Sequence, residues 1–133
     1  MSPEQRAQQA VATYGPACEQ KGSTVNRDVN GDGFDDLIIG AYSADASGNA
    51  KPNAGDSFVI FDNAARFGDV DLAALTPAQG FQIFGSDAFD SMGFSVSAGG
   101  DVNGDGFDDL IMGARSADGI GNAKVDAGES YVI

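Results

Sequence analysis

The sequence contains no histidine and only one cysteine, Cys18, among its 133 residues. Without histidine, the chain lacks the commonest general base of enzymes and the usual protein ligand of transition metals. A single cysteine cannot form a disulfide within the chain, and its simplest interpretation is a small, half-buried apolar side chain. No run of about 18 apolar residues is present, so the sequence predicts no membrane-spanning helix.

Basic residues are also scarce. Lys and Arg number 7 against 20 Asp and Glu, which gives a net charge of −13. Such a chain repels nucleic acid and anionic lipid, and we expect neither as a partner. Part of the acidic excess lies in two short loops, where the carboxylates would repel one another unless a cation lay among them.

The same sequence occurs twice in the chain. Residues 28–60 read DVNGDGFDDLIIGAYSADASGNAKPNAGDSFVI, and residues 101–133 read DVNGDGFDDLIMGARSADGIGNAKVDAGESYVI, with an offset of 73 and differences at only eight positions. We call these segments the first and second repeats. A repeat of this kind indicates a modular architecture, in which one unit buries its apolar face by stacking on a neighbour.

Within each repeat the local pattern predicts strands and turns. Clusters of Gly, Asn, Asp and Ser at 43–56 and 116–128 predict loops. One helical turn is expected near 72–75. Short apolar, β-branched or aromatic runs predict strands at 37–39, 57–61, 81–84, 93–97, 110–112 and 130–133.

The first 24 residues have no counterpart before the second repeat. Ser2-Pro3-Glu4 is a helix-start signal, so we expect either a short helix to about Thr13 or a disordered leader. We therefore divide the chain into residues 1–24, a leader or short helix outside the repeat, and residues 25–133, which hold two repeat units (25–97 and 98–133, the second incomplete).

The candidate metal-binding residues lie in two loops, and each loop reads D-x-N-x-D-G-F-D-D. Calcium takes six to eight oxygen ligands, and a short loop supplies them when alternate side chains point inward and a glycine at position six allows the sharp turn. The seventh residue then offers its carbonyl. The expected ligands of two calcium ions are Asp28, Asn30, Asp32, Phe34 (carbonyl) and Asp36 in the first loop, and Asp101, Asn103, Asp105, Phe107 (carbonyl) and Asp109 in the second.

The closing ligand separates these loops from an EF-hand. An EF-hand needs a glutamate at position twelve, where this chain has Ile39 and Met112. An aspartate at position nine instead closes a nine-residue site that fits the bend between two strands. Asp35 and Asp108, at position eight, are expected to point away from the ion into solvent. The alternative is a polar β-turn that binds no metal.

The segments FQIFG (81–85) and GFSVSAGGDVNGDGFDDLIMGA (93–114) together resemble the FG-GAP repeat of integrin α-subunit heads and of many secreted bacterial proteins. The resemblance implies an all-β fold of antiparallel, four-stranded β-propeller blades, with calcium bound in the loop between the first two strands of a blade. Arg115 replaces the proline of the GAP motif. The first copy lacks a clear innermost strand and the second an outermost one, so we expect a fragment or a self-assembling partial propeller.

These patterns favour a non-catalytic, calcium-binding module at the cell surface or outside the cell, although no signal peptide is visible. Its expected partners are calcium and an extracellular protein or glycan, and we predict no catalytic residue. One alternative is a self-assembling scaffold, in which a homo-oligomer completes a propeller. Another is an accessory part of a secreted hydrolase or lyase.

Overall fold

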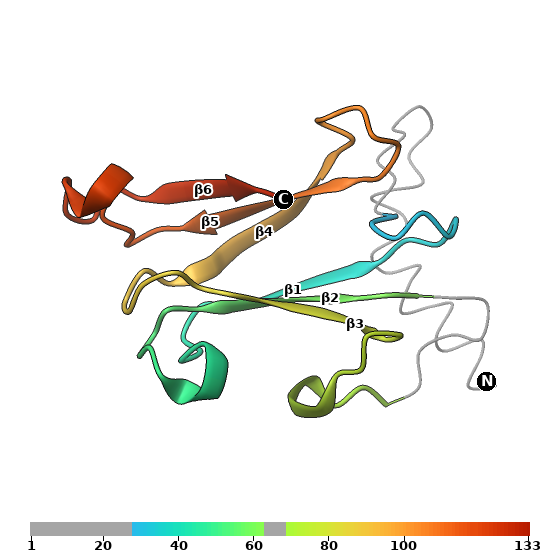
Figure 1. Ribbon diagram of the computed structural model, residues 1–133, viewed down its shortest axis with the longest axis horizontal. Helices are drawn as coiled ribbons and strands as arrows, with labels where there is room; N and C mark the ends of the chain where they lie inside the picture. Colours follow the sequence, from blue (N-terminus) through green and yellow to red (C-terminus); the bar gives the residue numbers. More distant parts are fainter. Residues whose placement is uncertain (1–27, 63–68) are drawn as a thin grey trace.

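Six strands form two antiparallel sheets in the computed structural model, which describes residues 28–62 and 69–133. The expected N-terminal leader or short helix and Cys18 lie outside these residues. Figure 1 shows the two sheets one above the other. The first sheet contains β1 (Leu37–Ala41), β2 (Asp56–Ile60) and β3 (Gly80–Phe84), and the second contains β4 (Met92–Gly100), β5 (Asp109–Ala114) and β6 (Glu129–Val132).

Each sheet is a meander in which consecutive strands pair. In the first sheet Leu37 lies opposite Ile60, and Asp56 lies opposite Phe84. The β4–β5 pair contains two register shifts, which bend the long strand β4. All six predicted strands are confirmed, and so is the all-β class. Each sheet has three strands among the described residues, rather than the four expected of a complete blade.

Three short 3-10 turns interrupt the loops: η2 (Ser47–Asn49), η3 (Leu72–Ala74) and η4 (Ile120–Asn122). η3 is the helical turn predicted near 72–75, and the carboxylate of Asp71 caps it by accepting the Ala73 N–H at 2.9 Å. η2 and η4 occupy the same place in the two repeats. Both lie in segments predicted as loops.

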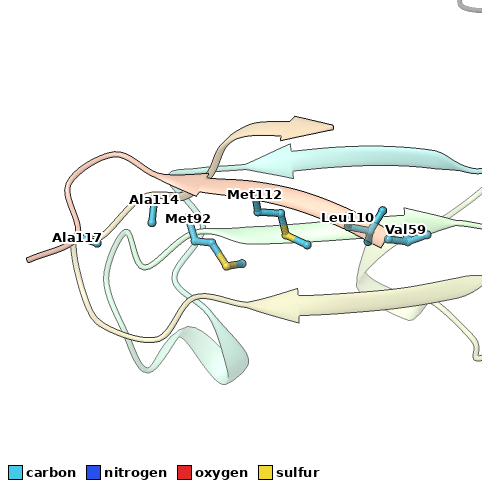
Figure 2. Close-up of a cluster of buried hydrophobic side chains, with 6 residues drawn as sticks. All are labelled: Val59, Met92, Leu110, Met112, Ala114 and Ala117. Atoms are coloured by element: carbon cyan, nitrogen blue, oxygen red, sulfur yellow. The ribbon is translucent and has the colours of Figure 1, made fainter. Parts of the chain in front are cut away.

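The core lies where the two sheets face each other. β4 packs against β1 and β2, which brings side chains of both repeats together. Figure 2 shows Val59 of β2 beside Leu110 of β5. Each sheet is therefore covered on one face by its neighbour, as expected of stacked repeats. The fully enclosed cluster is Val59, Met92, Leu110, Met112, Ala114 and Ala117.

Glycines allow the backbone of the first repeat and the backbone of β4 to approach each other closely. A Cβ atom added to Gly40 would lie 2.0 Å from the Gly93 carbonyl oxygen, and one added to Gly55 would lie 2.0 Å from the Met92 carbonyl oxygen. No side chain fits at that separation. The sheets therefore stack this closely only because both positions are glycine.

Candidate metal centres in two repeated loops

The two acidic loops lie at the same end of the stacked sheets. The first, residues 28–36, leads into β1, and the second, residues 101–109, joins β4 to β5. Figure 1 shows them side by side, in blue and orange, with η2 and η4 at the opposite end. The second loop thus occupies the bend between two strands, as its sequence predicts.

The first aspartate of each loop holds the turn together. Asp28 accepts the N–H groups of Gly31, Asp32 and Gly33 at 2.7–2.9 Å. Asp101 accepts the three equivalent N–H groups at 2.7–3.0 Å. Because a carboxylate has about four acceptor sites, these bonds leave capacity for a cation.

The third and fifth residues also turn their oxygens into the loop. Asn30 Oδ1 accepts the Asp32 N–H at 3.0 Å, and Asp32 Oδ1 accepts the Phe34 N–H at 2.9 Å. Asn103 and Asp105 make the same bonds in the second loop, both at 2.9 Å. The two loops therefore fold alike, and their side-chain oxygens are held by backbone N–H groups rather than left free to rotate.

The ninth residue is the most enclosed acid of each loop. Asp36 is 4% exposed and Asp109 is 7% exposed. Burial raises the pKa of Asp36 to about 6, although its bonds from the Val29 and Asp62 N–H groups oppose the shift. Asp109 accepts the Val102 N–H at 2.7 Å and the Asn103 side-chain amide at 3.2 Å. Each ninth residue thus ties the start of its loop to the following strand.

The predicted ligand atoms are of the chemical type that calcium prefers. All the predicted side-chain donors are carboxylate or amide oxygens, which a hard cation prefers, and no histidine or thiol competes. In the described part of the chain, however, no three acidic side chains already converge closely enough to hold a metal ion. Binding would therefore require the acidic side chains of a loop to move closer together.

The eighth residue is exposed in the first loop and half-buried in the second. Asp108 was expected to be solvated, but it is half-buried and accepts the Asp28 N–H at 3.2 Å, while its own N–H donates to the Asp28 carbonyl at 3.3 Å. Burial and the charges of Asp28 and Asp101 raise its pKa. A Cβ atom on Gly31 would lie 2.5 Å from the Phe107 ring, so the two loops also touch there. The sequence analysis did not predict this contact.

Two stacked antiparallel sheets, each carrying the same acidic loop at one end, define a β-propeller-type repeat module. The family model described as FG-GAP repeat matches residues 22–60 and 92–133, which is more than half of the chain. The chain therefore belongs to the FG-GAP repeat family. The two matches agree with a partial module of roughly two blades.

The family sets the general class of function. The FG-GAP repeat is a non-catalytic interaction module, and it typically occurs in extracellular or surface proteins. Within residues 28–62 and 69–133, no helix is long and apolar enough to cross a membrane.

Proposed function

We propose that this chain is a calcium-binding FG-GAP module that mediates adhesion or protein interaction outside the cell and performs no catalysis itself. One ion would bind in each acidic loop and fix it against the following strand. The ligands would be the ten residues predicted from the sequence, with the Phe34 and Phe107 carbonyls completing the two shells. An extracellular protein or a glycan would be the partner.

The observation that carries the proposal is the set of backbone hydrogen bonds that the two loops share. Both use the first aspartate to hold three successive N–H groups, and both bury the ninth aspartate. A turn without a metal needs no buried ninth carboxylate, which loses its hydration on burial. A cation at that position would compensate the cost, because the raised pKa of Asp36 reflects a charge that its surroundings stabilise poorly.

Calcium titration by calorimetry tests the proposal, with thermal unfolding in calcium and in chelator as a second readout. We expect one ion per loop. At a free calcium concentration of about 100 times Kd, each site would add about 2.7 kcal/mol to the free energy of unfolding. An unchanged melting temperature after chelation would refute a structural role for calcium.

Substitution of the ninth residue locates the sites. Asp109→Ala removes both carboxylate oxygens, so the second site loses its ninth-position ligand and the Val102 N–H loses its acceptor. We expect calcium binding at the second loop to be lost and binding at the first to remain. Asp36→Ala should give the converse. Retention of both ions in either variant would show that position nine is not a ligand.

A second candidate is a self-assembling scaffold, favoured by the free edge of β6. Among the described residues β6 pairs with β5 alone, and Val132 and Ile133 beside that edge are 57% and 53% exposed. Unpaired edges of this kind promote pairing with another chain. Light scattering at micromolar concentration in calcium buffer distinguishes a homo-oligomer, which this candidate requires, from a monomer.

A further inference from the structure

The second acidic loop contacts the first through two neighbouring residues, Phe107 and Asp108. The Asp108 carboxylate accepts the Asp28 N–H at 3.2 Å, and the Asp108 N–H donates to the Asp28 carbonyl at 3.3 Å. The Phe107 ring lies against Gly31, where an added Cβ atom would be 2.5 Å from a ring carbon. The second loop therefore holds both backbone polar groups of one residue of the first loop and packs against another.

Asp28 is the residue on which the first loop depends. Its carboxylate accepts the N–H groups of three successive residues, 31–33, at 2.7–2.9 Å, and it is the first predicted calcium ligand. The backbone of Asp28 sets the direction in which this carboxylate enters the loop. Because Asp108 bonds that backbone at both its N–H and its carbonyl, the second loop orients a ligand of the first.

Asp108 is in turn placed by the predicted ligands of its own loop. It lies in the chain between Phe107, which offers its carbonyl, and Asp109, the ninth-position ligand. Asp109 is 7% exposed and accepts the Val102 N–H at 2.7 Å. A cation bound to the Phe107 carbonyl and the Asp109 carboxylate would hold the backbone on both sides of Asp108. Filling the second loop would thus restrict Asp108 and, through it, Asp28.

Two effects of a filled loop act in opposite directions on the other loop. Its bound cation cancels part of the negative charge that attracts a second cation, which lowers the affinity of the other site. Both loops are largely exposed to solvent, so salt screens this loss, with a Debye length of about 8 Å at about 0.15 M. The hydrogen bonds between Asp108 and Asp28 act at contact distance, where such screening has little effect. At this salt concentration, positioning is therefore the larger effect.

We propose that calcium binding in one loop strengthens calcium binding in the other, and that Asp108 is the positioning residue that couples them. This coupling rests on the proposed function, because it requires both loops to bind calcium. Coupling between two sites is reciprocal, so each ion raises the affinity of the other site by the same factor. We expect a factor of at least about five, the lower end of the range usual for coupled sites.

Nuclear magnetic resonance of the whole chain during a calcium titration reports on each site separately. The Gly33 N–H donates to Asp28 at 2.8 Å, and the Gly106 N–H donates to Asp101 at 2.9 Å, so each amide signal follows the filling of its own loop. In about 0.15 M salt the two signals are expected to change together, with a Hill coefficient above about 1.

Asp109→Ala, which removes a ligand of the second site alone, measures the size of the coupling. The Gly33 signal should then give a calcium Kd for the first loop at least about fivefold higher than the wild-type value with the second loop filled. No predicted ligand of the first loop is changed in this variant.

Two substitutions of Asp108 test its role without altering a predicted ligand. Asp108→Ala removes the acceptor of the Asp28 N–H, whereas Asp108→Asn retains an oxygen acceptor and loses only the charge. We expect Asp108→Ala to fill its two loops independently and Asp108→Asn to keep the coupling. A merely structural role for Asp108 would change the melting temperature but leave the Hill coefficient as it is in the wild type.

The outcomes separate this coupling from the calcium proposal itself. Independent filling of the two loops in the wild type, a first-loop Kd that Asp109→Ala does not change, or coupling that survives Asp108→Ala would each overturn the coupling alone. Equal loss of coupling in Asp108→Asn and Asp108→Ala would overturn positioning by the hydrogen bond. Absence of calcium binding at both loops would overturn the proposed function, and the coupling with it.

Discussion

At the scale of single residues, the two repeats serve as controls for each other. Ala46 has φ 56° and ψ −165°, a region that is almost exclusive to glycine. Its counterpart Gly119 has φ 69° and ψ −177° and adopts the same conformation without a Cβ atom. The first repeat therefore carries backbone strain that the second repeat avoids.

Ala46→Gly is expected to stabilise the protein by about 1 kcal/mol, because relief of a strain of about 1–3 kcal/mol outweighs the lost burial of one methyl group. Urea unfolding measures the change. The reverse substitution, Gly119→Ala, should destabilise the protein. If both variants unfold at the wild-type urea concentration, the backbone at this turn is not strained.

Asp56 is another residue whose surroundings differ between the repeats. It is 5% exposed, its Oδ2 accepts a bond from Gln82 at 2.9 Å, and its Oδ1 has no partner. Burial raises its pKa above the ordinary 3.8, so ionisation is harder in the folded chain than in the unfolded one. The resulting destabilisation is absent below the unfolded pKa and grows as the pH rises through the folded value.

Asp56→Asn, which stays neutral, should therefore raise the melting temperature at pH 7 and lose this advantage near about pH 3. Thermal unfolding across that range measures it. Glu129→Gln, at the equivalent half-exposed position, serves as the control and should show a smaller gain. A gain for Asp56→Asn that is constant with pH would exclude ionisation as its cause.

The spacing of acids in the sequence was enough to predict which oxygens the loops gather, because those bonds join residues close in the chain. The role of Asp108 was not predictable in this way, since its partner Asp28 lies 80 residues away. The turns η2 and η4 were also missed. Their central glycines, Gly48 and Gly121, have positive φ inside the helical span, so no regular helical pattern marks them.

At the scale of elements, hydrogen bonds between Asp28 and Asp108 link the two acidic loops, so that each loop helps to stabilise the other. Asp108→Ala removes the acceptor of the Asp28 N–H and should lower the melting temperature. The loss should be about 1 kcal/mol in the free energy of unfolding. An unchanged melting temperature would mean that the loops fold independently of each other.

Strand positions were predictable because short β-branched and apolar runs are bounded by glycine and asparagine. The pairing of strands within each repeat also follows, since consecutive strands form a meander. The stacking of β4 on β1 was not visible in any local pattern. It depends on glycines whose function is to have no side chain, and such an absence produces no periodic signal in the sequence.

At the scale of the whole molecule, substitutions at Gly55 and Gly128 show how much stability the stacking of the two sheets provides. Both have positive φ, 84° and 77°, so alanine strains the backbone similarly at either position. A Cβ atom on Gly55 would also lie 2.0 Å from the Met92 carbonyl oxygen of the other sheet, whereas one on Gly128 would meet nothing nearer than 3.5 Å. The difference between the two variants therefore isolates the contact between the sheets.

Gly55→Ala is expected to lower the free energy of unfolding by about 1–3 kcal/mol more than Gly128→Ala, because the backbone of β4 must move away from the first repeat. Denaturant unfolding of both variants in calcium buffer supplies the two values. Hydrogen exchange of β4 gives an independent readout, since separation of the sheets should speed exchange there in Gly55→Ala alone. If the two variants are equally stable and exchange alike, the repeats do not depend on this stacking.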